Sequence, residues 1–445
     1  MSTFHLVSLG CAKNLVDSEV MLGLLQENGW VLTEDPAAAE VLIVNTCGFI
    51  QPAVEEALEV ILEMGSYKED DPGKYLVVTG CLVQRYLAGL SEDLLEVDLF
   101  VGTEGVADIA NLLQKLMEGK QTEKSYCPDR FLMNASLPRT LATPFFRSSV
   151  KITEGCNNRC TYCMIPSIRG DLRSRDIADI IVELQRLEAA GVKEISLIAQ
   201  DLTAYGNDLD GQVNLIGLLS SILKETSFPW LRLMYLYPSG VTEELYELMQ
   251  NEIRILPYMD IPFQHVSDAI LKRMHRRYGY DDLCNFVGRI RAAVPDIALR
   301  TTMMVGFPGE TEEDVQQLEG FLKQYRIDHV GVFSYTNEEG ARSEFFEAQV
   351  PEEVKHERMQ QILELQAGIS KEILQKYIGQ TVPVLVEGLS RETDLLLEGR
   401  TVYQAPEIDG CVYINDGIAN PGDIVQVRIT EAQIYDLVGG IVEAG

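Results

Sequence analysis

Three cysteines close together in the middle of the chain carry the strongest chemical signal of the sequence. Cys156, Cys160 and Cys163 lie within eight residues, directly after a predicted strand, and are called the core set below. A loop this short can wrap three thiolates around one face of an iron–sulfur cluster and leave the fourth iron open to a substrate or cofactor. Structural zinc usually needs paired knuckles with a fourth Cys or His, and no His lies between Glu154 and His265. Zinc and three unconnected thiols are therefore the weaker alternatives.

A second set of three cysteines is spread over the first part of the chain. Cys11, Cys47 and Cys81, the N-terminal set, each follow a predicted strand and each lie beside a glycine, which permits close approach of the backbone. In an open parallel sheet the ligand crevice lies outside the carboxyl ends of the strands, so we expect these thiols to converge on a second cluster. The alternative is that each is a buried small hydrophobe. No function is assigned to the remaining three, Cys127, Cys284 and Cys411.

These motifs resemble the methylthiotransferase family of radical S-adenosylmethionine (SAM) enzymes. The Cys-x3-Cys-x2-Cys spacing, with Tyr162 before the last cysteine, is similar to the radical SAM signature, and the resemblance covers the whole chain. It is greatest to the RimO branch, whose members modify an aspartate on a protein of the small ribosomal subunit. The segments that carry it are SLGCAKNLVDSE (8–19), EGCNNRCTYCMIPSIRGDLRSR (154–175), PYMDIPFQHVSDAILKRMHR (257–276) and APEIDG (405–410).

The resemblance implies cofactors and a mechanism. The core set would hold a 4Fe-4S cluster that cleaves SAM, with Tyr162 as the expected cofactor-binding residue, and the N-terminal set would hold an auxiliary 4Fe-4S cluster. One SAM would methylate a sulfur associated with the auxiliary cluster. A second SAM would yield the 5′-deoxyadenosyl radical that removes hydrogen from the β-carbon of the substrate aspartate. No residue is assigned a catalytic role beyond these ligands.

Hydrophobic periodicity predicts a multidomain α/β protein with three zones. Alternating strands and helices predict a parallel α/β sheet over 1–119, and a proline-bearing linker covers 120–143. A larger strand and helix repeat over 144–377 suits a TIM-like β/α barrel, partial or full. Short β-type runs over 378–445 favour a small closed β-barrel, by resemblance the TRAM domain. The candidate strands of the middle zone are 149–152, 194–198, 231–235, 297–305 and 329–334.

Composition constrains the partners. The formal net charge of −31 argues against unassisted binding to nucleic acid, whose phosphates are contacted through Lys and Arg. Between Thr381 and Gly445, eleven acidic side chains face three arginines, which suits a basic ribosomal protein, free or within the ribosome; acidity that merely aids solubility is the alternative. No segment predicts a membrane span or a signal peptide. We therefore expect a cytoplasmic enzyme that needs a reductase or flavodoxin-type electron donor.

Two other functions stay open at this stage. The first is a methylthiotransferase that acts on tRNA adenosine, as the MiaB branch does, and steep salt dependence of binding would reveal it. The second is an iron–sulfur electron carrier without catalysis of its own, which would leave SAM intact.

Four polar segments could contribute to the site, although each also has a purely structural explanation. A dense basic run could contact a carboxylate or form a solvated helix face, and a Gly-Pro turn could border SAM or only cap a helix. Two further groups lie where predicted barrel strands end, where barrel enzymes place functional residues. These segments are Lys272–Arg277, Gly306–Thr311, Gln200–Asp201 and His265.

Overall fold

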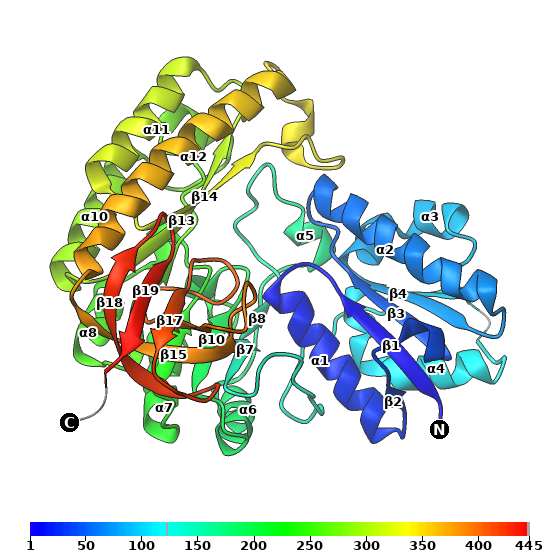
Figure 1. Cartoon of the computed structure of the whole chain (residues 1–445). Helices are drawn as coiled ribbons and strands as arrows, with labels where there is room; N and C mark the ends of the chain where they lie inside the picture. The colour runs from blue at the N-terminus through cyan, green and yellow to red at the C-terminus, as the bar shows by residue number, and fades with distance from the viewer. Residues whose placement is uncertain (122, 443–445) are drawn as a thin grey trace.

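The computed structural model describes residues 1–121 and 123–442 and has three units in chain order (Figure 1). The predicted fold class is confirmed, because two parallel α/β units are followed by a closed five-stranded β-barrel. Glu443, one of the eleven acidic residues counted above, lies outside the described residues. Within the described ranges, no helix combines the length and the apolar character needed to cross a membrane.

The N-terminal unit is a parallel sheet with the strand order β2-β1-β3-β4-β5-β6 and helices on both faces. Its central strand β3 is buried along its whole length, as expected of a strand covered on both sides. The register pairs Ser8 with Asn45 and Thr46 with Gly80, so β1, β3 and β4 end together at one edge. Its strands are β1 (Thr3–Ser8), β2 (Val31–Leu32), β3 (Val41–Thr46), β4 (Tyr75–Gly80), β5 (Leu99–Val101) and β6 (Ser125–Tyr126). Its helices are α1 (Ala12–Glu27), α2 (Gln51–Asp70), α3 (Cys81–Asp93) and α4 (Ile109–Met117).

The middle unit is a six-stranded parallel sheet in the order β14-β13-β12-β11-β10-β7, an open, partial barrel. Its strands are β7 (Arg147–Lys151), β10 (Glu194–Ile198), β11 (Trp230–Leu233), β12 (Ile255–Asp260), β13 (Ala298–Val305) and β14 (His329–Ser334). The hairpin of β8 (Thr153–Glu154) and β9 (Arg173–Ser174) follows β7. The helices are α5 (Ile165–Ile168), α6 (Ile177–Ala189), α7 (Leu215–Glu225), α8 (Glu243–Asn251), α9 (Asp268–Arg273), α10 (Tyr280–Ala293), α11 (Glu312–Tyr325) and α12 (Glu352–Leu374).

Strand β12 was not among the sequence-based candidates. Pro257 lies inside it, and a proline argues against a central strand because it cannot donate to the ladder. Here β12 pairs with β11 through an irregular register and with β13 only from Tyr258 onward. The proline is therefore accommodated where regular pairing is interrupted.

The two faces of the partial barrel differ in chemistry. Residues such as Ile195, Leu197 and Leu299 belong to the large apolar cluster shared with the surrounding helices. Because successive side chains of a strand point to opposite faces, the alternating positions lie on the other face, and in several strands they include charged side chains. Glu194 and Arg232 are among them, and both are fully buried. Buried charges of this kind require partners.

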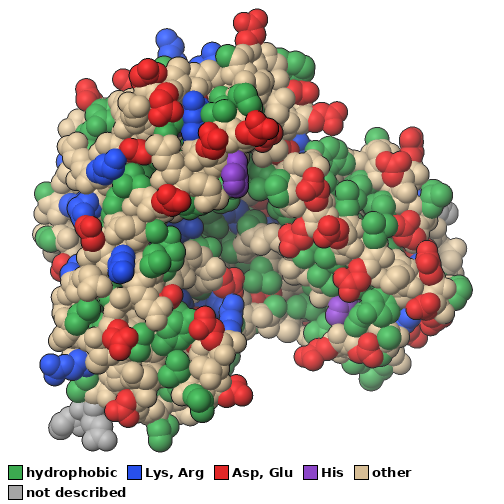
Figure 2. Space-filling model, turned by 45° about the horizontal axis from the view of Figure 1, so that its top comes forward, with side chains coloured by type: hydrophobic (Ala, Val, Ile, Leu, Met, Phe, Trp, Pro, Cys, Tyr) green, Lys and Arg blue, Asp and Glu red, His purple; other side chains and the backbone are tan. Residues whose placement is uncertain are grey.

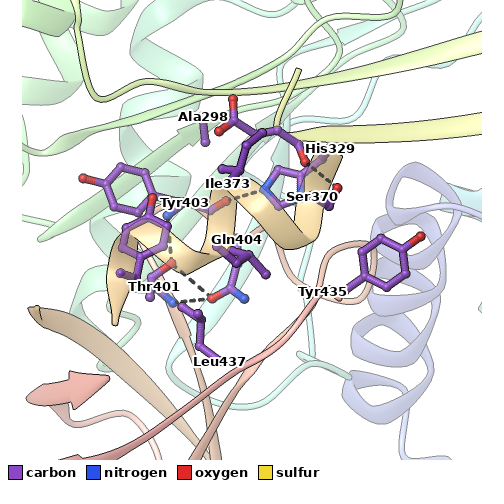
Figure 3. A pocket seen from close by; sticks show the side chains of 12 residues that line it. Ala298, His329, Ser370, Ile373, Thr401, Tyr403, Gln404, Tyr435 and Leu437 are labelled. Carbon is purple, nitrogen blue, oxygen red and sulfur yellow. Dashed lines mark hydrogen bonds between the residues drawn. The ribbon is translucent and has the colours of Figure 1, made fainter. Parts of the chain in front are cut away.

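The third unit supplies those partners. It closes as β15-β16-β17-β19-β18, with β15 (Thr381–Leu389), β16 (Leu397–Thr401), β17 (Val412–Asp416), β18 (Ile424–Ala432) and β19 (Leu437–Ile441). Arg400 of β16 donates to Glu194 at 2.6 Å, and Arg232 donates to the same carboxylate at 2.7 Å. Asp409, in the loop after β16, accepts from Tyr258 at 2.8 Å and lies 3.4 Å from Arg300. A small cleft of about 20 Å³ remains at this junction, where His329 contacts the Tyr403 carbonyl (Figure 3).

These contacts revise the role expected for the acidity of the barrel. Asp409 is only 2% exposed, and Glu387 contacts both Arg147 and Arg400. Glu407 also pairs with Arg147. Three of the acidic side chains thus help to hold the barrel on the middle unit, and of these only Glu407, whose side chain is 55% exposed, still faces solvent.

Glu194 provides a test of this docking. Burial alone would raise its pKa, but the guanidinium groups of Arg400 and Arg232 outweigh burial and lower the pKa to about 2. Glu194→Gln leaves two buried arginines without their carboxylate, so we expect a loss of about 3–5 kcal/mol in unfolding free energy at neutral pH. Urea unfolding of the cluster-free chain measures it.

The pH dependence follows from the direction of the shift. A lowered pKa stabilises the folded chain above the ordinary value of 4.5, and this contribution is lost as the pH falls towards about 2. The difference between the parent and Glu194→Gln should therefore shrink below pH about 4.5. The control is Glu372→Gln, which breaks an exposed pair with Arg326 and should cost at most about 1 kcal/mol. Equal losses in the two variants would contradict the assignment.

Candidate active site

The N-terminal set lies at the shared edge of β1, β3 and β4. Cys11 precedes α1, Cys47 follows β3, and Cys81 is the first residue of α3. Glycine is required beside them, because Gly10 has a φ of +88° and a Cβ there would lie 2.7 Å from the Cβ of Cys47. The expected juxtaposition of strand ends is therefore present, and Gly10 brings two of the thiols close together.

The thiols of this set act on one another electrostatically. Burial raises the pKa of Cys47 to about 11, with further contributions from Cys81 and Cys11. Burial also raises the pKa of Cys81, against the opposing charge of Arg169. Cys11 differs from the other two, because its pKa is lowered. Part of the residue is exposed to solvent, but many protein atoms surround the thiol, and this burial acts to raise the pKa. The positive charges of Lys13 and Arg169 and nearby backbone amides outweigh burial.

The core set lies in the loop between β8 and α5. Burial raises the pKa of Cys163 to about 12, and Cys160 and Cys156 add to the effect, so these thiols are also close neighbours. The loop is held by Asn158, whose side-chain amide donates to Asp201 at 2.7 Å. Gln200 similarly donates to Glu154, at the start of the loop, at 2.9 Å. Gln200 and Asp201, at the end of β10, thus support the cysteine loop.

Arg276 gives the basic run 272–277 a specific role. Its guanidinium lies 3.5 Å from the Cys160 sulfur, donates to the Pro262 carbonyl at 2.5 Å, and stacks on Tyr237 and Tyr278. The run is therefore not simply a solvated helix face, because one of its members reaches the core set. Arg273 instead holds the 306–311 turn through the Pro308 carbonyl.

The other segments have structural positions. Tyr162 packs edge-on against Phe307, with ring centroids 6.4 Å apart, beside the core set. His265 is fully buried between Glu310 and the Ser267 amide. Thr311 caps α11 by accepting from the Asp314 amide, as predicted for this turn.

A buried ion network joins the two cysteine sets across the domain boundary. Lys151 of β7 donates to Asp17 of α1 at 2.5 Å and to Glu154 at 2.6 Å. Arg169 donates to Asp17 at 2.7 Å and to the Cys81 sulfur at 3.3 Å. These four charged residues were not predicted from the sequence, although three of them lie inside the segments that resemble the family.

A second contact closes the other side of the boundary. Arg85 of α3 donates to Glu338, in the loop after β14, at 2.9 Å, and both side chains are at most 5% exposed. The backbone amide of Gln51, at the start of α2, donates to the other carboxylate oxygen of Glu338 at 2.9 Å. Figure 2 shows a hollow between the two units, with apolar and some basic side chains inside it.

The donor chemistry of both sets fits iron–sulfur clusters. Each set offers three thiols that lie close enough to raise the pKa of a neighbour, and thiolates are the usual cluster ligands. In residues 1–121 and 123–442, no three or more His, Cys, Asp and Glu side chains are grouped so as to hold a metal ion. A cluster binds its thiolates through different irons, so its cysteines are spread more widely than the ligands of one ion.

Comparison with known proteins identifies the family. The chain matches the radical SAM superfamily over residues 150–322, the uncharacterized protein family UPF0004 over 3–102 and the TRAM domain over 378–442. It is 60% identical to "Ribosomal protein uS12 methylthiotransferase RimO" of Desulfotalea psychrophila over 99% of both chains. The chain belongs to the RimO family. The protein of the same name from Geobacter sulfurreducens is 45% identical over 98% of both chains.

Solved structures support the fold of this RimO family member. The radical SAM methyltransferase TsrM from Kitasatospora setae aligns with a TM-score of 0.56 at 16% identity, over 75% of this chain and 73% of TsrM. The cobalamin-dependent radical SAM enzyme OxsB aligns with a TM-score of 0.52 at 12% identity, over 82% of this chain and 56% of OxsB. Membership establishes a radical SAM transferase that uses SAM and iron–sulfur chemistry.

Gly10→Ala tests whether the backbone beside Cys11 positions the N-terminal set. Alanine at position 10 would have to adopt a left-handed φ, which costs about 1–2 kcal/mol. Its Cβ would also clash with the side chain of Cys47. We expect lower stability and less iron bound after anaerobic reconstitution.

Gly29→Ala is a matched control, because Gly29 has a φ of +80° but nothing lies within 4 Å of its added Cβ. Gly29→Ala should lose a similar amount of unfolding free energy from backbone strain but bind as much iron as the parent. Equal iron content in the two variants would show that contact with Cys47 does not matter.

Proposed function

We propose that the chain transfers a methylthio group to the β-carbon of an aspartate in ribosomal protein uS12, with one 4Fe-4S cluster on each cysteine set. The relatives named above carry the uS12 activity in their names, and the identity extends over almost the whole chain. The observation that carries the two-cluster reading is that both sets adjoin one buried network at one domain boundary. The domain limits 1–119, 120–143, 144–377 and 378–445 remain part of this proposal.

The residues of the chain supply position and exclusion of water. When bound, SAM and the clusters supply a carbon radical and a sulfur platform. Asn158 and Asp201 fix the core loop, and Tyr162 is the expected SAM neighbour. The buried contact between Arg85 and Glu338 holds the two units together, which favours a site shielded from water.

Charge favours a basic protein substrate over tRNA. Glu55, Glu56 and Glu59 are exposed on α2, and Glu339 and Glu347 are exposed on the facing loop. Figure 2 shows acidic side chains on both sides of the hollow. These charges would attract a basic protein and repel phosphates. The proposal further includes a reductase or flavodoxin-type electron donor and, because the substrate is ribosomal, action in the cytoplasm.

The function is tested by product analysis. The anaerobically reconstituted chain is incubated with SAM, a reductant and either uS12 or tRNA, and the products are analysed by mass spectrometry. We expect one added methylthio group on a uS12 aspartate and none on tRNA. Modified tRNA would establish the first rival function, and intact SAM under reducing conditions would support an electron carrier.

The cysteine sets give separable expectations. Replacing Cys156, Cys160 and Cys163 by Ala should halve the iron content, because the auxiliary cluster remains. It should also abolish reductive SAM cleavage, because the cluster that cleaves SAM is lost. Replacing Cys11, Cys47 and Cys81 by Ala should also halve the iron but leave SAM cleavage detectable and stop methylthio transfer. Iron analysis and chromatography of 5′-deoxyadenosine measure both. Full iron content in either variant would refute that ligand assignment.

The exposed acidic residues on α2 and on the facing loop, called the acidic rim here, give a prediction about how fast uS12 associates with the enzyme. Changing Glu55, Glu56 and Glu59 together to Gln should lower kcat/KM on whole uS12 severalfold at low salt, because exposed charges act mainly on association. The loss should shrink as salt rises and be absent on a short peptide with the target aspartate.

A matched control places the same charge change elsewhere. Glu313, Glu357 and Glu364 are exposed on α11 and α12, away from α2 (Figure 1). Their joint change to Gln should leave turnover of uS12 unchanged. A similar loss in both triple variants, or a loss on the peptide as well, would remove the rim from substrate docking.

A further inference from the structure

Arg169 belongs to the middle unit, but its guanidinium contacts the sulfur of Cys81 in the N-terminal unit. It follows α5, six residues after Cys163, and its side chain is 3% exposed. One guanidinium nitrogen, Nη2, lies 3.3 Å from the Cys81 sulfur. The other, Nη1, donates to Asp17 at 2.7 Å and lies 3.4 Å from Glu154. The fork of the guanidinium thus spans the domain boundary in a fixed orientation.

The groups around Arg169 balance their charges before the sulfur is counted. Lys151 and Arg169 carry two positive charges, and Asp17 and Glu154 carry two negative charges. All four side chains are nearly or fully buried, so each depends on the others for compensation. A cluster-bound Cys81 thiolate adds negative charge next to the one guanidinium nitrogen that faces it.

The same network reaches the core set through the backbone. Glu154 accepts from Lys151 and lies two residues before Cys156. Displacement of Arg169 would therefore disturb the ligand loop of one set and the sulfur of the other together. Arg139 and Arg173 also bridge the two units, to Glu19 and Glu104, but neither has a recorded contact with a sulfur among the described residues.

We propose that Arg169 is a positioning residue that ties Cys81 of the auxiliary cluster to the middle unit and raises the reduction potential of that cluster. The inference rests on the proposed two-cluster function. A cation that donates a hydrogen bond to a ligand sulfur stabilises the reduced, more negative cluster, and such hydrogen bonds and charges are known to set cluster potentials. The carboxylates of Asp17 and Glu154 keep the guanidinium from following the sulfur, so the separation of the two sets is also fixed.

The test isolates the auxiliary cluster. The chain with Cys156, Cys160 and Cys163 changed to Ala is the background, and Arg169→Gln, Arg169→Lys and the control Arg173→Gln are added to it. Midpoint potential, the EPR spectrum of the reduced state and iron content are measured anaerobically. Arg169→Gln should lower the midpoint potential and alter the spectrum.

The two further variants separate charge from fold. Arg169→Lys keeps the charge but loses the fork, so its potential should lie between those of the parent and Arg169→Gln. Arg173→Gln removes an interdomain pair with Glu104 and a contact with the Arg169 backbone carbonyl. It keeps the Arg169 guanidinium, so the potential and the spectrum should stay close to those of the background. In the chain with both cysteine sets intact, Arg169→Gln should also weaken the magnetic interaction between the two reduced clusters, because their separation is no longer fixed.

The outcomes distinguish this inference from the function on which it rests. If the background binds no iron while Arg169 is intact, the two-cluster function fails and the inference fails with it. If the background binds a cluster whose potential and spectrum are the same with Arg, Lys and Gln at position 169, the inference alone is overturned. A shift of the same size in Arg173→Gln would also overturn it, because any lost interdomain charge would then suffice.

Discussion

The buried ion network between α1 and β7 is the interaction on which the arrangement of the site depends. The two cysteine sets belong to different folding units, and neither set can position the other through its own backbone. Lys151, Asp17, Arg169 and Glu154 join the units by short, directional contacts away from water. Buried charges tolerate little displacement, since removal of one partner leaves another uncompensated. The network therefore defines one relative placement of the two units.

The same physical device recurs at the opposite side of the middle unit. Glu194 and Arg232 of the middle unit are buried, and without the C-terminal barrel Glu194 would keep only Arg232 as an ion-pair partner. Arg400 of the C-terminal barrel supplies the second partner. Complementary charge thus helps to hold the chain together at both boundaries. An apolar cluster that runs from the N-terminal unit through Trp230 of the middle unit to Leu385 of the C-terminal barrel adds to it.

Much of the fold and the grouping of the cysteines could be predicted, because spacing along the chain and the ends of the strands reveal both. The core set lies within eight residues, and the N-terminal set follows three apolar strands that must end at one edge of a parallel sheet. Strand β12 escaped prediction because Pro257 imitates a strand break. The role of Arg169 was not predicted, because its partner Asp17 lies 152 residues away in the sequence and no local pattern encodes such a pair. A weak signal existed: Asn14, Asp17 and Ser18 form a polar stripe on one face of α1, and all three are buried.

The segment 405–410 has a consequence for how such chains can exchange parts. It resembles the RimO branch, and Asp409 within it sits 2% exposed between Tyr258 and Arg300 of the middle unit. A C-terminal barrel transplanted from another branch would have to bring a matching carboxylate, or Tyr258 would lose its hydrogen bond and Arg300 would keep only the more distant Asp260. Recombination at this boundary is therefore compatible with folding only when the barrel and the strand ends beneath it are inherited together.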